Sequence, residues 1–266
     1  MIAKAENMFA ESNTASEITD KDYQLINESI ETAKAFARSA NQCVYIVDFF
    51  KKNFLYISEN FANLCGLRPD EIMDMGFDFY MDYTPKNEHA ILAEISKKSF
   101  ELFCEMPLET RQHSVVSFNR HILCDQKEVL VSQHCTPIKL APNGHIWLAL
   151  CTITMPTDNA VGNILMKLPG KKSYLEYSRD KHEWTKKEYV DLSQTEWKIL
   201  ALSAQGCTMD DIATKLFKSI DTVKANKKSL FFKLGAKNIV QALALAIFGK
   251  AMNCFDLIFQ NEENNS

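Results

Sequence analysis

The stretch Ser219–Leu234 reads Ser-Ile-Asp-Thr-Val-Lys-Ala-Asn-Lys-Lys-Ser-Leu-Phe-Phe-Lys-Leu and predicts one helix with two different faces. Three apolar residues spaced by seven and four share one face: Val223, Leu230 and Leu234. At about 100° per residue, four others fall on the opposite side: Lys224, Ala225, Lys228 and Phe232. Such a helix could be anchored by its apolar stripe and enter a major groove with its lysines. Taken alone, the pattern favours the other interpretation, an amphipathic surface helix with a solvated basic face, because charged helix faces are common.

The residues before this helix predict a helix-turn-helix unit. Thr208 can cap a helix over Met209–Leu216 by accepting a free backbone N–H of its first turn. Phe217 and Lys218 then form a short turn into Ser219, whose hydroxyl can cap the next helix in the same way. Because two helices joined by such a turn make a helix-turn-helix, the basic helix is its second member.

Two more helices are predicted around this unit. The sequence Ser193-Gln-Thr-Glu196 is a capping box, and we expect Glu196 to bond internally to backbone or to a basic residue. After Gly235, a fourth helix starts near Asn238. It is more apolar than one small core needs, so we expect it to pair two copies of the chain. The expected dimer contacts are Ile239, Val240, Leu243 and Ile247.

Charge is unevenly distributed along the chain. The 266 residues carry a net charge of −4, but Lys186 to Lys250 contain eleven lysines and six acidic residues. That block therefore carries +5 and leaves −9 on the remainder. A basic C-terminal block behind an acidic body suggests that one end of the protein meets a polyanion.

The composition of the chain limits the other classes of protein to which it could belong. The chain is long enough for two modest domains, and no apolar run reaches the roughly 18 residues of a membrane span. Residues 1–20 lack the apolar segment of a signal peptide, so we expect a cytoplasmic protein, with no membrane partner and a partly disordered N-terminus. The eight cysteines lack metal-site spacing, which favours reduced, buried thiols, with a redox role as the minor alternative. No metal site is predicted, and no catalytic motif is found, so we expect no enzyme activity.

The N-terminal part predicts an α+β domain. Residues 21–42 form a lead-in helix, and two β-branched and aromatic runs between 44 and 57 form a hairpin. Helical segments follow, and the longest of them covers Pro85–Phe103. Three predicted strands come next: Ser114–Leu123, Glu128–Thr136 and His145–Ile153. This order, in which two strands are followed by helices and then by three strands, predicts an antiparallel five-stranded sheet with helices on one face.

Residues 43–155 resemble a PAS domain. The resemblance is carried by Tyr56-Ile-Ser-Glu-Asn-Phe61, Leu64, Gly66-Leu67 and Glu71-Ile72. It implies a sensory, dimerising module that holds a small ligand or cofactor between sheet and helices. Residues 156–191, with prolines, glycines and lysine pairs, are predicted to be a linker with short strands.

Residues 192–250 resemble the LuxR/FixJ-type helix-turn-helix domain, which leaves 251–266 as a C-terminal tail. The matching residues are Leu192, Ser193, Glu196, Gly206, Ile212, Ala213, Leu216, Ser219, Thr222, Val223, Lys224, Lys233, Leu234, Gly235 and Ala242. The resemblance implies an all-α four-helix domain. Its third helix would enter the major groove, and its fourth would pair two copies.

The resemblance also assigns the groove-facing positions to Lys224, Ala225 and Lys228. Lysine can donate to guanine or to phosphate, so these residues need not specify a base. Phe232 stands where a basic residue is common in the family, and its role is open. No arginine occurs after Arg179, so bidentate guanine readout is not expected and dimerisation must supply specificity.

The remaining candidates for DNA contact are Thr222, Ser219, Thr208 and Lys227. The hydroxyls lie at helix starts, where they could hold a phosphate or simply cap the helix, and capping is favoured for Ser219 and Thr208. Lys227 falls closer to the buried side, where its stem could snorkel.

The sequence does not identify a signal or ligand-pocket residues. No histidine has the setting of an axial haem ligand, and Cys65 lacks the flavin-adduct context. No cofactor is predicted; a small-molecule ligand and a cavity filled by the chain's own side chains both remain open. We expect a DNA-binding transcriptional regulator that acts as a homodimer on double-stranded DNA and contacts the transcription machinery. The alternatives are a protein-interaction module docking through its C-terminal helices and a haem or ligand sensor with incidental DNA binding.

Overall fold

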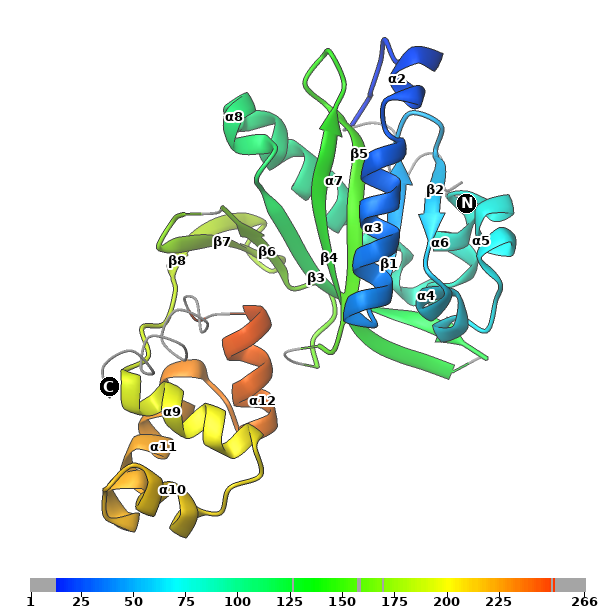
Figure 1. Cartoon of the computed structure of the whole chain (residues 1–266). Coiled ribbons are helices and arrows are strands. Elements are labelled where there is room, and N and C mark those ends of the chain that lie inside the picture. The colour runs from blue at the N-terminus through cyan, green and yellow to red at the C-terminus, as the bar shows by residue number, and fades with distance from the viewer. Residues whose placement is uncertain (1–12, 126, 157–158, 169, 250, 252–266) are drawn as a thin grey trace. The chain divides into compact units, whose positions relative to one another are not determined.

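The computed structural model describes residues 13–125, 127–156, 159–168, 170–249 and 251 of the chain. Residues 1–12 of the expected disordered N-terminus and residues 252–266 of the expected tail lie outside the described residues. The chain divides into two compact units, Met1–Lys187 and Glu188–Ser266, each of which is described by itself (Figure 1).

The N-terminal unit is built on one sheet whose described strands run in the order β2-β1-β5-β4-β3-β6-β7-β8 (Figure 1). The strands are β1 (Cys43–Asp48), β2 (Asn53–Ile57), β3 (Val115–Cys124), β4 (Lys127–Leu140), β5 (Ile146–Thr154), β6 (Ile164–Lys167), β7 (Ser173–Ser178) and β8 (Glu183–Glu188). Every pairing from β2 across to β7 is antiparallel.

The predicted five-stranded sheet is therefore too small, because the sheet has eight strands. The additional strands β6, β7 and β8 lie in the stretch expected to be a linker with short strands. Strand β6 pairs with β3, with Phe118 opposite Ile164, so β3 is not the sheet edge. Ile164 and Met166 are buried, and that burial holds β6 on the sheet although it has only four residues.

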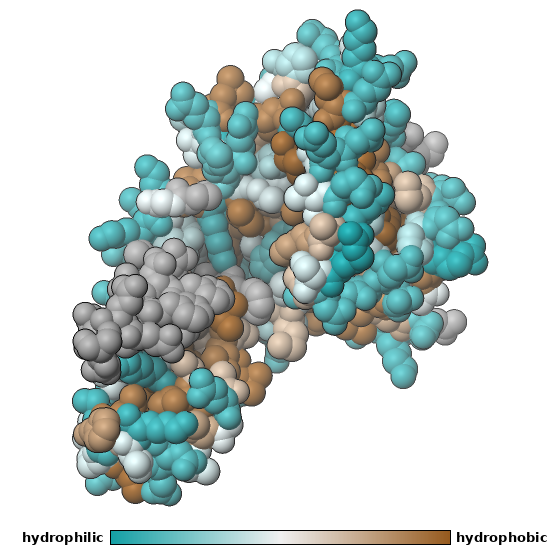
Figure 2. Space-filling model, viewed as in Figure 1, coloured by the Kyte–Doolittle hydropathy of each residue, from teal (hydrophilic) through white to brown (hydrophobic). Residues whose placement is uncertain are grey.

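Helices cover both faces of this sheet rather than one. They are α2 (Asp20–Gln24), α3 (Asn27–Ala40), α4 (Glu59–Leu64), α5 (Pro69–Met75), α6 (Asp78–Asp82), the 3₁₀ turn η1 (Lys86–Glu88), α7 (His89–Glu105) and α8 (Leu108–Arg111). Helix α3 lies on one face, where Ile26 and Ile30 pack with Trp147 of β5, and α7 lies on the other (Figure 1). The visible surface of this unit is mostly hydrophilic, with scattered apolar side chains (Figure 2).

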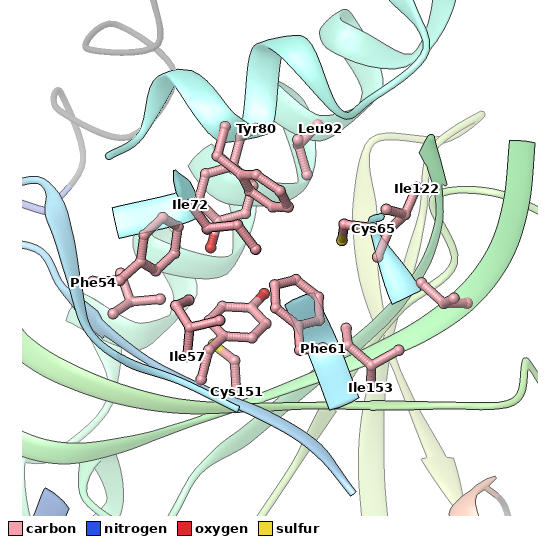
Figure 3. Close-up of a cluster of buried hydrophobic side chains, with 14 of the residues drawn as sticks. Phe54, Ile57, Phe61, Cys65, Ile72, Tyr80, Leu92, Ile122, Cys151 and Ile153 are labelled. Atoms are coloured by element: carbon pink, nitrogen blue, oxygen red, sulfur yellow. The ribbon is translucent and has the colours of Figure 1, made fainter. Parts of the chain in front are cut away.

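The main core of the N-terminal unit lies between the sheet and helices α4 to α7. Figure 3 shows Tyr80 and Leu92 from the helices facing Ile57, Cys151 and Ile153 from the strands. Aromatic rings fill much of this space, and Tyr45 stacks on Phe61 with ring centroids 4.6 Å apart. Each buried aromatic side chain of this kind contributes more than its area alone through its ring contacts.

The C-terminal unit contains the four predicted helices. They are α9 (Gln194–Ala204), α10 (Met209–Lys215), α11 (Ile220–Leu234) and α12 (Ile239–Ala244), and α12 continues as a π-helical turn, η2 (Leu245–Gly249). Trp197, Ile199 and Leu200 of α9 pack with Ile212 of α10 and Leu230 of α11. Within the described ranges, no single helix is long and apolar enough to span a membrane. The bent pair of α11 and α12 reaches that length and apolar composition only when the two helices are counted together.

Candidate nucleic-acid interface and ligand cavity

Helix α11 is fixed by one apolar face and by its two ends. Val223, Leu230 and Leu234 are each at most 2% exposed, which confirms the predicted buried stripe. Ser219 caps the helix, since its Oγ accepts the backbone N–H of Thr222 at 3.2 Å. Gly235 ends it at a φ of 70°, the left-handed conformation that glycine adopts without strain.

The opposite face of α11 is open to solvent. Lys224, Ala225 and Lys228 are all exposed on it, as the helical period predicts. The Nζ of Lys224 lies 3.8 Å from Oδ1 of Asp221, and both side chains are mostly exposed. An exposed pair of this kind contributes about 0–1 kcal/mol, so Lys224 can leave Asp221 for another anion at little cost. The structure thus groups the three residues, and their contact with DNA stays a prediction.

The candidate hydroxyls are engaged in capping. Oγ of Ser219 and Oγ1 of Thr222 are 2.8 Å apart, and Ser219 also takes the N–H of Thr222. Thr208 caps α10, and its Oγ1 donates to Oδ2 of Asp211 at 2.6 Å. Because all three side chains are exposed at helix starts, a phosphate could replace these local partners.

Two side chains on α11 differ from the lysine pair. Lys227 is half-buried, and its Nζ lies 5.9 Å from the ring centroid of Phe231, in agreement with a position nearer the core. Phe232 is 88% exposed and lies one helical turn beyond Lys228 on the same face. Such an exposed aromatic side chain beside the lysines offers an apolar contact to a molecule that binds this face of α11.

Glu196 joins α9 to α11. Its side chain is 2% exposed; Oε2 accepts from Lys233 Nζ at 2.8 Å and from the Ser193 backbone N–H at 2.7 Å, and Oε1 accepts from Ser229 Oγ. Burial alone would raise the pKa of Glu196, but the hydrogen bonds from Lys233 and Ser193 outweigh it and hold that pKa below its ordinary value. The expected internal bond of Glu196 to a basic residue is therefore confirmed.

Replacing this carboxylate with Glu196→Gln is expected to lower the free energy of unfolding of the C-terminal unit by about 1–3 kcal/mol at pH 7. Because the folded pKa is depressed, the stabilisation is present above the ordinary value of 4.5 and is lost as the pH falls through the folded pKa. Hydrogen exchange of the α9 and α11 amides measures the change in this unit. The exposed Glu183→Gln should leave these rates unchanged. A difference between Glu196→Gln and wild type that is as large after Glu196 has been protonated as at pH 7 would contradict the assignment.

The fourth helix presents only part of the predicted dimer face. Val240 of α12 is 64% exposed, and Ile247 of the π-helical turn η2 is 52% exposed. Ile239 and Leu243 are half-buried and pack against the core of their own unit. The exposed part of the candidate face is therefore centred on Val240 and Ile247.

A cavity of about 80 Å³ lies in the N-terminal unit between α7 and the sheet. Its wall is mostly apolar, with Leu92 and Phe103 from α7 and Met166 from β6 among the lining residues. One water needs roughly 10–15 Å³ on this measure, so the space admits a compact molecule. Two hydroxyls that line it, Ser96 and Ser99, are buried without a hydrogen-bond partner in the part of the chain that the structure describes.

Arg120 is joined to the cavity wall through Gln133 and was not identified from the sequence. It is 1% exposed, its Nε donates to Oε1 of the cavity-lining Gln133 at 2.7 Å, and its Nη2 has no hydrogen-bond partner among the described residues. The one signal in the sequence is the alternation of β3, where Arg120 stands between the buried Phe118 and Ile122. Over the same described ranges, no group of three or more metal-ligating side chains could hold a metal ion.

A compact four-helix unit in which a capped turn delivers an exposed basic helix is a helix-turn-helix domain. Residues 190–246 match the family described as bacterial regulatory proteins, luxR family (GerE), and form a LuxR-family helix-turn-helix domain. No curated protein matches the chain.

Several solved structures are similar to the chain. The complex of Vibrio cholerae VqmA with ligand and DNA is 20% identical, covers 80% of this chain and 84% of its own, and has a TM-score of 0.33. The Vibrio cholerae VqmA dimer without target DNA is 21% identical, with coverages of 82% and 88% and a TM-score of 0.33. The phage VqmA–DPO complex is 18% identical, with coverages of 86% and 89% and a TM-score of 0.32.

Proposed function

We propose that this chain is a DNA-binding transcriptional regulator whose helix α11 enters the major groove. The observation that carries the proposal is the exposed face of Lys224, Ala225 and Lys228 on the second helix of a LuxR-family helix-turn-helix domain. Small Ala225 lets the helix approach the bases, while the two lysines reach phosphates or guanine edges. The exposed hydroxyls of Ser219 and Thr208, at the starts of α11 and α10, would add phosphate contacts.

The chain acts in this proposal as a homodimer, with two copies of α11 about one helical turn of DNA apart. Without arginine in the reading helix, one copy gives modest discrimination, and two half-sites supply the rest. The exposed apolar side chains of Val240 on α12 and Ile247 on η2 support this pairing, because exposed apolar side chains favour self-association.

The variant Val240→Asp is expected to raise the dissociation constant of the full-length dimer at least tenfold. The reason is that it places a charge in an apolar contact, where an unpaired charge costs several kcal/mol. Sedimentation velocity over a concentration series measures the shift. Leu25→Asp, at an apolar position that is 76% exposed in the N-terminal unit, is the matched control and should sediment as wild type. A dimer that survives Val240→Asp and Ile247→Asp together would place the interface elsewhere.

The N-terminal unit is proposed to be the sensor, with a PAS-like core. Its strand order β2-β1-β5-β4-β3 and the helices between β2 and β3 support this assignment, with β6 to β8 as an extension. The cavity beside α7 supports a small ligand with an apolar body. Its polar group would lie at the Gln133 end, where the buried guanidinium of Arg120 favours an electron-rich atom.

Salt dependence separates this function from its rival, a protein-interaction module that docks through the C-terminal helices. Fluorescence anisotropy of the full-length chain with promoter duplexes should show a logarithm of affinity that falls steeply and linearly with the logarithm of salt concentration. A salt-insensitive complex with a protein and no measurable DNA affinity at low salt would favour the rival.

A further inference from the structure

Two cysteines meet in the wall of the cavity. Cys135 of β4 and Cys151 of β5 stand directly opposite each other in the antiparallel register, and their Sγ atoms are 3.2 Å apart. Opposed Cα atoms in such a pair are about 4.5–5.5 Å apart, which is within the range that a disulfide spans. Both residues line the cavity, and Figure 3 shows Cys151 among the side chains that meet in the core. A small solute that enters the cavity therefore meets both cysteines.

The surroundings make the two thiols unequal. Cys151 donates to Sγ of Cys135, and Nε2 of Gln133 donates to the same sulfur at 3.2 Å. These hydrogen bonds, with the nearby guanidinium of Arg120, lower the pKa of the Cys135 thiol against the effect of burial. Burial, together with the neighbouring Cys135, raises the pKa of the Cys151 thiol. The arrangement provides one nucleophilic sulfur and one resolving thiol in contact.

We propose that Cys135 and Cys151 form a redox-active dithiol that a small hydroperoxide in the cavity oxidises to a disulfide. In the first step the Cys135 thiolate attacks a peroxide oxygen: an S–O bond forms, the O–O bond breaks, and the leaving oxyanion takes a proton. In the second step the sulfur of Cys151 attacks the sulfenic sulfur, so that the S–S bond forms, the S–O bond breaks, and hydroxide leaves with the thiol proton as water. Two thiols are oxidised, and one hydroperoxide is reduced.

The disulfide would alter the surface that a ligand touches. The sulfur atoms would move from 3.2 Å apart to about 2.05 Å, and the thiol that donates to Cys135 would disappear. Gln133, which links this pair to Arg120, lies at the same end of the cavity. Oxidation and ligand binding therefore act on one site, and this inference stands whether or not the chain binds DNA.

To test this, the full-length reduced chain is treated with hydrogen peroxide, and the remaining thiols are blocked by alkylation. The protein is then digested with trypsin, and the peptides are mapped by mass spectrometry. Cleavage after Lys139 separates the two cysteines into peptides 128–139 and 140–167, so the bond appears as a cross-linked pair that reductant releases. We expect this pair to form before any other. A different cysteine pair, or alkylation of both thiols after peroxide, overturns the inference.

Variants test the two roles separately. Cys151→Ser should leave a sulfenic acid on Cys135 that dimedone traps, whereas Cys135→Ser should leave Cys151 reduced. Gln133→Leu should slow disulfide formation by roughly threefold to tenfold, since the thiolate loses a donor. Cys65→Ser, which changes another buried thiol of the same unit, is the matched control and should oxidise like wild type. Oxidation of Cys151 in the Cys135→Ser variant, or an unchanged rate with Gln133→Leu, would contradict the assigned order.

Discussion

Replacing Lys224 and Lys228 together by alanine in the full-length chain is expected to lower affinity for duplex DNA by about 10²- to 10³-fold. Both side chains are exposed on the face of α11 that lies opposite its buried stripe, so the change leaves the core of the C-terminal unit intact. A proposed dimer would lose four cationic contacts at once. Anisotropy titrations against a duplex selected by the wild-type chain from a random pool measure the loss.

The salt dependence gives this experiment a second readout. Each lost phosphate contact reduces the slope of log affinity against log salt concentration by about one. The slope of the dimeric double variant should therefore be smaller than that of wild type by roughly four. Lys171→Ala/Lys172→Ala is the matched control, because it removes the same charge from two exposed lysines of the N-terminal unit. If the two double variants bind alike at several salt concentrations, α11 is not the reading helix.

Local patterns were sufficient to predict helix α11. The spacing of Val223, Leu230 and Leu234 determines a buried face at the helical period, and the structure confirms it. The caps at Ser219 and Thr208 were predictable for the same reason, because a cap depends on residues within one turn. The assignment of Lys224 and Lys228 to DNA needs a bound duplex, so it stays a prediction.

Contacts between distant residues could not be derived in the same way. The basic partner of Glu196 on α11 is Lys233, which lies 37 residues further along the chain, and only the packing of α9 on α11 selects it among several lysines. The stretch that holds β6 to β8 was predicted only as a linker with short strands, and no strand was predicted at β8. The place of these strands in the sheet depends on the free edge of β3, which composition does not reveal.

The cavity site was hidden for a related reason. Arg120 and Gln133 meet diagonally because Phe118 pairs with Gln133 across β3 and β4. Cys135 and Cys151 meet because β4 and β5 pair in one register, despite an irregularity that follows at Pro137. A shift of one residue would turn each of these side chains to the other face. Only the finished sheet therefore shows that they share one site.

Replacing Arg120 and Gln133 together, as Arg120→Met/Gln133→Leu, is expected to raise the free energy of unfolding of the N-terminal unit by about 1–4 kcal/mol. Arg120 is 1% exposed, and no carboxylate of the described residues forms an ion pair with it. Its contact with Oγ1 of Thr84 is long, at 3.4 Å, and its Nη2 is unpartnered within the described chain. Burying a charge with so few partners costs several kcal/mol, and apolar residues of similar volume remove that cost.

Hydrogen exchange of the β3 and β4 amides in the full-length chain measures this stabilisation. Arg111→Met is the matched control, because the guanidinium of Arg111 donates to the carbonyls of Met106, Gly144 and Cys104. Since those bonds satisfy Arg111, its removal should destabilise the unit by about 1–3 kcal/mol. A stabilised double variant would mean that Arg120 is retained at the expense of stability, as expected of a residue held for a ligand. If the double variant instead unfolds more readily than wild type, Arg120 is a structural residue, and the proposed polar end of the cavity loses its main support.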